Sequence, residues 1–184
     1  MTYLLPSIRL WLATMLICVV GYALLVFGFA QTFASFRANG SLLEFEGRVV
    51  GSELVAQDFT SPEYFWPRPS AVDYDGMGAG GSNLSPTSDD LAARAAETVE
   101  RYGATADRPI PADLVAASGG GLDPHISLAG ALYQAERIAA ARRIEVAAVR
   151  ELIHDSAYAP GGFLAPERIV NVLQLNLALD RMAQ

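Results

Sequence analysis

An uncharged apolar run of twenty-one residues, from Leu10 to Ala30, constrains this chain more than any other feature of its sequence. A helix rises 1.5 Å per residue, so roughly 20 apolar residues are needed to cross a hydrocarbon core of about 30 Å. Any other backbone conformation in that core would leave peptide groups without hydrogen-bond partners. The run therefore predicts one transmembrane helix over residues 10–30, preceded by a short cytoplasmic N-terminus of residues 1–9.

A cleaved secretory signal is the alternative interpretation of the same run. Gly28 and Ala30 place small residues where a signal peptidase would cut before Gln31, which would release a secreted binding module. The apolar part of a signal usually has about 7–15 residues behind a positively charged start. Here the run is longer, and Arg9 is the only charged side chain before it. The length favours a retained anchor.

The charges around the run bear on its orientation and on the partners of the rest of the chain. Arg9 precedes the run while Arg37 and Arg48 follow it, so the count of cations alone does not decide the orientation. A short N-terminus with an arginine, followed by a long acidic domain, favours an N-terminus inside and an extracytoplasmic domain. Without Arg9 the formal net charge of −7 becomes −8 for the part after the run. Such an acidic surface disfavours nucleic acid, whose binding depends on clustered Lys and Arg.

Residues 31–184 are enough for one soluble domain with its own core. Their pattern predicts an α+β fold. Two short apolar segments, 41–45 and 48–54, predict a β-hairpin because Glu46-Gly47 between them suits a tight turn.

A long loop is predicted from residue 57 to residue 86, where proline and glycine exclude a regular helix or a central strand. Its aromatic residues favour an ordered loop that packs on the core, because disordered segments are poor in aromatic residues. A carbohydrate- or peptide-binding role is the alternative for these rings. They are Tyr64, Phe65, Trp66 and Tyr74.

The next segment has the spacing of an amphipathic helix. Ser88 is expected to cap it, and Gly103 to end it. Leu91, Ala95, Val99 and Tyr102 would face the core, while Arg94 and Arg101 would face water. Residues 111–115 predict one helical turn or an extended segment.

Further helices are predicted in the C-terminal half. Ser127 is a natural N-cap for a helix that runs to Arg143, and a shorter helix follows from Val146 to Ile153. The segment 172–182 fits a strand or a helix, and a helix capped by Asn171 is preferred. Pro160, Gly161 and Gly162 break the chain before Phe163-Leu164, which we expect to anchor that loop.

The residues before the Ser127 cap read ASGGGLDPHIS, from Ala117 to Ser127. A glycine-rich loop ahead of a helix can bind phosphate through free backbone N–H groups. However, the chain has no GxxxxGK[ST] motif, and Gly119-Gly120-Gly121 does not match GxGxxG. A self-sufficient nucleotide site is therefore not favoured.

Asp123 and His125 in the same stretch allow three interpretations. A turn that caps the following helix explains both residues and is favoured. A metal site would need further ligands, for which His154 and Asp155 are candidates. A Ser118–His125–Asp123 triad is the third interpretation, although no nucleophile elbow surrounds Ser118.

Five blocks, in this order and behind one N-terminal span, resemble the C subunit of the Kdp potassium-transporting ATPase. The resemblance covers nearly the whole chain. The blocks are Asn39–Leu42, Arg68–Ala71, Gly80–Leu84, Ser118–Ser127 and Asn176–Asp180.

The resemblance implies a non-catalytic accessory subunit of an ATP-driven, high-affinity potassium uptake pump in the bacterial inner membrane. It would assemble or stabilise the complex and raise the affinity of the ATPase subunit for ATP, as a catalytic chaperone. Its partners would be a channel-like K⁺ subunit, a P-type ATPase subunit and membrane lipid. It would have no cofactor of its own and would share ATP with the ATPase subunit. A membrane-anchored hydrolase and a secreted binding module are the alternatives.

The resemblance also implies site residues, none of them catalytic or metal-binding. Gln134 and Arg137 form the Q-x-x-R pattern of the family, at a position linked to nucleotide contact. The nucleotide-related residues would be Gln134, Arg137, Ser118, Gly119, Gly120 and Gly121. The family-motif loop would be Asp123, Pro124, His125 and Ser127.

Overall fold

The computed structural model describes residues 3–164 and 166–182. The chain divides into two compact units, Met1–Leu42 and Leu43–Gln184. Each unit is described by itself below.

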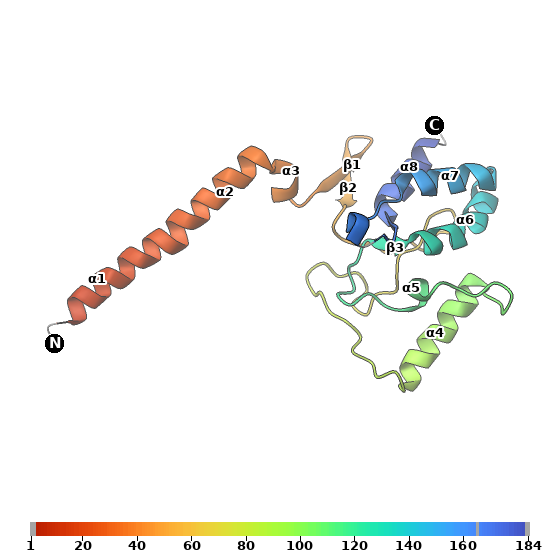
Figure 1. Cartoon of the computed structure of the whole chain (residues 1–184), viewed down its shortest axis with the longest axis horizontal. Helices are drawn as coiled ribbons and strands as arrows, with labels where there is room; N and C mark the ends of the chain where they lie inside the picture. Colours follow the sequence, from red (N-terminus) through yellow and green to blue (C-terminus); the bar gives the residue numbers. More distant parts are fainter. Residues whose placement is uncertain (1–2, 165, 183–184) are drawn as a thin grey trace. The chain divides into compact units, whose positions relative to one another are not determined.

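The first unit contains the predicted apolar helix (Figure 1). Leu4–Phe33 forms 30 helical residues that include an 18-residue stretch with a mean hydropathy of 2.4, and it is the one described helix that is long and apolar enough to cross a membrane. It consists of α1 (Leu4–Met15), a π-helical segment η1 (Leu16–Gly21) and α2 (Tyr22–Phe33). The helix extends beyond residues 10–30 at both ends. Pro6 does not break it, because Pro6 lies in the first turn, where its missing N–H removes no helical hydrogen bond. A short helix, α3 (Ser35–Ala38), follows.

The predicted hairpin is present as β1 (Leu42–Phe45) and β2 (Arg48–Ser52), which form a two-stranded sheet. Glu46 and Gly47 have φ angles of 50° and 75°. Positive φ at both central residues is the signature of a type I′ turn, whose twist matches that of the flanking strands.

The second unit contains a smaller sheet that the sequence did not predict. Strand β3 (His125–Ser127) pairs antiparallel with β4 (Ile169–Asn171), and Ile126 lies opposite Val170. Three residues are too few to show the alternation that identifies a strand, and the partner strand is distant in the sequence. The sequence instead predicts a turn at Asp123 and His125 followed by the N-cap at Ser127, with no strand.

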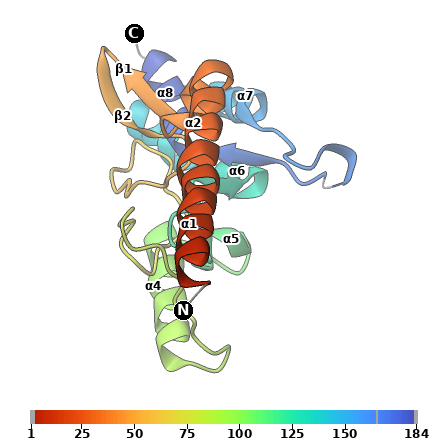
Figure 2. The ribbon, with the colours of Figure 1, turned by 90° about the vertical axis from the view of Figure 1, so that its left-hand side faces the viewer.

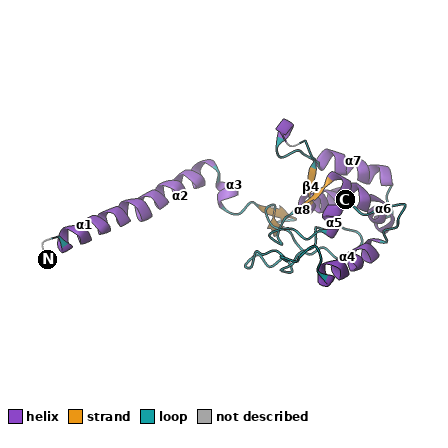
Figure 3. Cartoon of the chain, turned by 60° about the horizontal axis from the view of Figure 1, so that its bottom comes forward, coloured by secondary structure: helices purple, strands orange, loops and turns teal. Residues whose placement is uncertain are grey.

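Three helices, each predicted from the sequence, pack with this sheet (Figure 3). They are α6 (Leu128–Arg142), α7 (Val146–Ser156) and α8 (Val172–Met182). The ambiguous C-terminal segment is a helix, and the predicted cap forms because the Gln174 N–H donates to Asn171 Oδ1 at 3.1 Å. The remaining helical elements are α4 (Asp89–Tyr102), the short α5 (Ala112–Val115) and a 3₁₀ turn, η2 (Gly162–Leu164).

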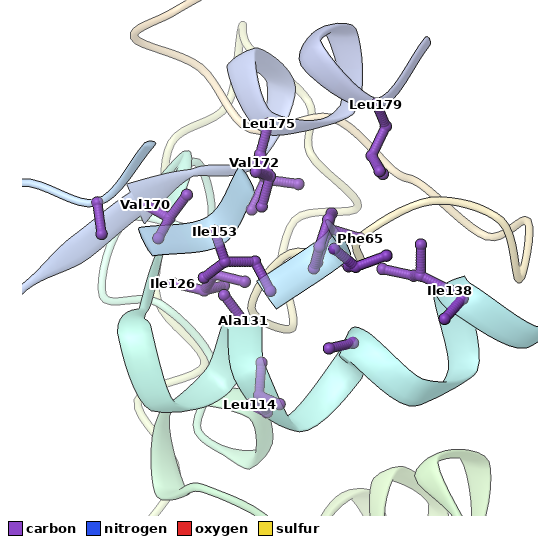
Figure 4. Close-up of a cluster of buried hydrophobic side chains, with 14 residues drawn as sticks. Phe65, Leu114, Ile126, Ala131, Ile138, Ile153, Val170, Val172, Leu175 and Leu179 are labelled. Carbon is purple, nitrogen blue, oxygen red and sulfur yellow. The ribbon is translucent and has the colours of Figure 1, made fainter. Parts of the chain in front are cut away.

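The core lies where α6, α7 and α8 meet the sheet, and Figure 4 shows its side chains. The predicted long loop between β2 and α4 contributes Phe65, which is fully buried. The loop is therefore ordered and packed, as its aromatic residues indicated. The other large buried side chains of the core are Leu114, Ile126, Ile138, Val149, Ile153, Val170, Leu175 and Leu179.

The orientation of α4 corrects two predictions. Arg94 is half-buried, whereas Val99 is 37% exposed, so the inward face includes Arg94 and Thr98 in place of Val99. Ser88 occupies the N-cap position, but its side chain makes no capping hydrogen bond. Gly103 ends the helix in the left-handed region with φ 60°, as predicted.

The loop after α7 corrects a third prediction. Phe163 and Leu164 were expected to anchor this loop on the core, yet they are 91% and 81% exposed. Figure 2 shows the loop extending away from the helices and the sheet.

Candidate functional site

Gln134 lies on the buried face of α6 and holds the long loop in place. It is 1% exposed. Its Oε1 accepts a hydrogen bond from the Trp66 N–H at 2.8 Å, and its Nε2 donates to the Trp66 carbonyl at 3.1 Å. One amide side chain thus satisfies both backbone groups of Trp66, which have no strand partner inside the protein.

Arg137 lies one turn further along α6 and joins the same cluster. Its Nη2 donates to Gln134 Oε1 at 2.7 Å and to the Tyr64 carbonyl at 3.0 Å, and its Nη1 donates to the Pro62 carbonyl. Its guanidinium carbon lies 3.7 Å from the centroid of the Trp66 ring. Burial lowers the pKa of Arg137 to about 10, which still leaves the group cationic at neutral pH.

Aromatic rings and guanidinium groups extend the cluster toward α4. The Trp66 ring meets the Tyr102 ring edge-on at 5.2 Å, and Arg101 places its guanidinium carbon 4.1 Å from the centroid of Trp66. Two guanidinium groups, those of Arg101 and Arg137, therefore already lie against the indole ring of Trp66. Each such contact over a tryptophan face is attractive, so the arrangement rigidifies the loop.

A cavity of about 440 Å³ lies beside Trp66. Burial raises the pKa of Tyr74 to about 12 and also raises that of Tyr102, so both hydroxyls stay protonated at neutral pH. Three carboxylates and two guanidinium groups are among the lining residues, so a polyanion would meet repulsion there. These charged residues are Asp58, Asp73, Glu97, Arg94 and Arg101.

The glycine-rich segment Ser118–Gly121 packs against the long loop, away from Gln134. The Ser118 N–H donates to the Pro69 carbonyl at 3.0 Å, and Ser70 Oγ donates to the Gly121 carbonyl at 2.7 Å. Gly121 has φ 70°, and a Cβ there would lie 2.5 Å from Val72 Cγ2. Glycine is needed at position 121 for this close approach. Gly119 and Gly120 have no atoms near the place of a Cβ.

The N-terminus of α6 is occupied by the chain's own side chains. Ser127 Oγ accepts from the Gly130 N–H at 2.8 Å, which confirms the predicted cap. Asp113 of α5 accepts from the Ser127 N–H at 2.7 Å through Oδ2 and from Ser127 Oγ at 2.9 Å through Oδ1. A carboxylate thus lies where a phosphate would bind at a helix N-terminus.

Asp123 and His125 form the turn that the sequence favoured, but the turn leads into β3 and does not cap a helix, because Ser127 caps α6. Asp123 Oδ1 accepts from the His125 N–H at 3.0 Å and lies 3.2 Å from His125 Nδ1. Arg68 pairs with the other oxygen, Oδ2, at 3.2 Å. The hydrogen bond with the His125 side chain is the main cause that lowers the pKa of Asp123, and the His125 N–H and Arg68 add to it. Pro124 contributes its carbonyl, which accepts from the Val172 N–H at 2.9 Å.

The Ser118–His125–Asp123 triad does not form. His125 Nδ1 lies beside Asp123, but the other ring nitrogen, Nε2, lies 2.9 Å from the Tyr158 hydroxyl. The ring therefore has no nitrogen left to take a proton from Ser118. Within residues 3–164 and 166–182, no three His, Cys, Asp or Glu side chains lie close enough together to hold a metal ion.

The residues that the resemblance linked to a nucleotide therefore lie in two places. Gln134 and Arg137 surround Trp66, whereas Ser118–Gly121 contact the segment around Ser70. Among the described residues, no hydrogen bond or ion pair joins the two groups directly. Any contact of these residues with a nucleotide stays a prediction.

Comparison with known proteins identifies the family. The family model described as K⁺-transporting ATPase, c chain, matches residues 4–181. The chain belongs to this family. It is 64% identical over 177 residues to the potassium-transporting ATPase KdpC subunit of Parvibaculum lavamentivorans, covering 96% of this chain and 95% of the relative. The KdpC subunits of Mycobacterium tuberculosis H37Rv and Serratia proteamaculans are 47% and 45% identical, with at least 97% of each chain covered.

This c chain is thus a subunit of the K⁺-transporting ATPase, a membrane-associated transporter. The resemblance identified from the five sequence blocks is confirmed. The single N-terminal apolar helix of Leu4–Phe33 agrees with such a subunit.

Sequence reasoning missed several partners of the motif residues. Tyr158, which contacts His125, and Asp113, which contacts Ser127, are distant in the sequence and carry no local signal. A signal did exist for Gln134, because its position one turn after Ala131 places a polar side chain on the apolar face of α6. A polar residue in a core position needs a buried partner.

Proposed function

We propose that this c chain is an accessory subunit that assembles the K⁺-transporting ATPase and assists its ATPase subunit without catalysing a reaction itself. The helix Leu4–Phe33 would anchor it among the lipids of the bacterial inner membrane. A channel-like K⁺ subunit and a P-type ATPase subunit would be its protein partners.

The observation that carries the proposal is that the motif residues use their polar groups internally. Gln134 bonds Trp66 and Arg137, Asp123 lies against His125 and Arg68, and Ser127 caps α6. A hydrolase would need a base directed at a nucleophile, and His125 contacts Asp123 and Tyr158 instead. A motif that fixes a shape suits a protein that other subunits recognise.

We infer that any effect of Gln134 on ATP affinity is transmitted through the loop that it holds. The side chain is 1% exposed and makes three hydrogen bonds, so a nucleotide would have to displace Trp66 to reach it. The chain would then act as a catalytic chaperone by shaping the ATPase complex. It would need no cofactor of its own, and ATP would be bound mainly by the ATPase subunit.

Purification of the complex through a tag on the ATPase subunit tests this proposal. We expect this chain to co-purify with the channel-like and ATPase subunits, and the purified chain alone to hydrolyse no ATP. Complexes made without the chain should be recovered in lower yield and should have a higher KM for ATP. Hydrolysis by the isolated chain, or an intact complex with unchanged KM in its absence, would contradict the proposal.

We also propose that the N-terminus is cytoplasmic and the second unit extracytoplasmic. Met77 is 96% exposed, so a Met77→Cys variant in a Cys18→Ala background offers one accessible thiol for an impermeant maleimide. Labelling of intact cells from outside is expected, with the Cys18→Ala chain as the unlabelled control. Labelling only after the inner face is opened would reverse the orientation and make direct contact with cytoplasmic ATP feasible.

A further inference from the structure

The loop between α7 and β4, residues 157–168, has a fixed base. Tyr158 and Ile169 exchange backbone hydrogen bonds of 3.0 and 2.9 Å across the two ends of the loop. Arg168 Nη2 donates to the carbonyls of His154 and Ala157, each at 2.7 Å. These bonds hold the base, so the direction in which the loop extends is set by the fold.

The tip of this loop is apolar and exposed. Phe163 and Leu164 lie in the 3₁₀ turn η2, and the exposed fractions of these side chains are 91% and 81%. No charged residue occurs between Ser156 and Pro166. These two large apolar side chains are hardly buried by their own domain. Exposed apolar groups of this kind mark interaction sites.

We propose that Phe163 and Leu164 insert into an apolar cleft with a cationic rim on another protein subunit of the K⁺-transporting ATPase. This inference rests on the proposed accessory role, and it names the surface through which that role is exerted.

The charges near the tip indicate which charges the partner should carry around its cleft. Asp155, Glu167 and Arg168 are all exposed near the loop base, and Arg168 also donates to two backbone carbonyls, so carboxylates outnumber guanidinium groups there by two to one. The part of the chain after the apolar run carries a formal net charge of −8, since Arg9 alone is removed from −7. Complementary charges favour a partner with Arg or Lys around its cleft. A second copy of this chain would instead present the same acidic rim.

Lipid is a poorer occupant than protein for two physical reasons. Residues 160–164 are not in a regular α-helix or strand, and irregular backbone does not occur within the hydrocarbon region unless protein or water satisfies it. Anionic headgroups attract basic segments, and the exposed Asp155 and Glu167 would be repelled.

The double variant Phe163→Ser/Leu164→Ser tests the inference in the full complex. The matched control is Met77→Ser, which removes another almost fully exposed apolar side chain from a different loop. After purification through the ATPase subunit and washing in detergent, we expect at least tenfold less of the double variant than of wild type to be retained. The control should be retained like wild type.

Thermal unfolding of the full-length chain in detergent separates loss of contact from loss of fold. Because both tip side chains are exposed, the double variant should unfold at the wild-type temperature. Equal retention of the double variant and wild type, or equal loss from the double variant and the control, would overturn the inference while leaving the accessory role intact. Failure of the wild-type chain itself to co-purify would overturn both.

A photo-crosslinking benzoylphenylalanine at position 163 identifies the occupant. A crosslink to another subunit of the complex supports the inference. Crosslinks confined to lipid, or to a second copy of this chain, would overturn it.

Discussion

At the scale of single residues, two buried amide side chains organise the long loop. Gln134 of α6 pairs with the N–H and carbonyl of Trp66, and Asn176 of α8 pairs in the same way with those of Phe65, at 2.8 and 3.1 Å. Two adjacent loop residues thus enter the core with their backbone groups satisfied. The long loop can be buried here because side chains supply the bonds that a neighbouring strand usually supplies.

Replacing Gln134 by Leu should destabilise the second unit. The change introduces an apolar side chain of similar size but leaves the Trp66 backbone groups unsatisfied, which costs about 2 kcal/mol. For a chain of this size the unfolding temperature should fall by roughly 4–8 °C. Gln174→Leu is the control, because Gln174 is an exposed glutamine on α8 whose side chain donates a solvent-exposed hydrogen bond to Glu53, so a loss of less than about 1 kcal/mol is expected. Equal losses from the two variants in thermal unfolding would contradict the assigned role of Gln134.

Asp123 should make part of the stability depend on pH. Its hydrogen bond with His125 lowers its pKa below 3.8 in the folded chain. The resulting stabilisation is present above the ordinary pKa and is lost as the pH falls through the lowered one. The free energy of unfolding of Asp123→Asn should therefore fall less steeply than that of wild type between about pH 5 and pH 2. Asp107→Asn, which alters an exposed carboxylate without a described hydrogen bond, should retain the wild-type slope.

At the scale of elements, the two serines at helix starts differ in what they do. Ser127 Oγ accepts from the Gly130 N–H and donates to Asp113, so it joins α6 to α5. Ser88 stands at the same position of α4 but makes no side-chain capping bond. The same residue type at the same helix position therefore contributes differently to stability, because the Ser127 hydroxyl bonds the Gly130 N–H and Asp113 whereas the Ser88 side chain makes no capping bond.

Ser127→Ala and Ser88→Ala form a matched pair that measures this difference. Loss of the Ser127 cap should cost about 1–2 kcal/mol, since an N-cap serine and its hydrogen bond to Asp113 are both removed. Ser88→Ala should cost less than about 0.5 kcal/mol. The measurement is the free energy of unfolding of each full-length variant in detergent. A larger effect at Ser88 than at Ser127 would refute the assignment of the caps.

At the scale of the whole molecule, an apolar helix and an acidic unit divide the chain into parts suited to different solvents. Leu4–Phe33 has no charged residue apart from Arg9 and no buried side chain in α1 or α2. The apolar helix is therefore suited to a membrane, and the acidic second unit is suited to water.

The mature chain should keep its N-terminal helix. A span of 30 helical residues exceeds the apolar part of a cleaved signal. Mass spectrometry of the chain purified from membranes should give a mass that includes residues 1–30, and alkaline carbonate should not extract it. A mature chain that begins at Gln31 would instead establish the secreted form.

How much the sequence predicted depends on the range of each interaction. The long apolar helix, the Glu46-Gly47 turn, the long loop, Gly103 and the Ser127 and Asn171 caps follow from residues within a few positions of one another. Five ordered blocks also sufficed to identify the family. These features were predicted correctly because apolar runs, tight turns and helix ends are specified by residues close together in the sequence.

Only the tertiary structure decided which distant segments meet. In the folded chain β3 pairs with β4, and Arg94 is half-buried. Gln134 is hydrogen-bonded to Trp66, and the two ring nitrogens of His125 contact Asp123 and Tyr158. The tertiary structure also left Phe163 and Leu164 outside the core, where the sequence had placed them inside. Short strands have no periodicity, and a polar or apolar side chain does not specify its partner. Those pairings depend on how the helices and the long loop pack together, which local sequence does not encode.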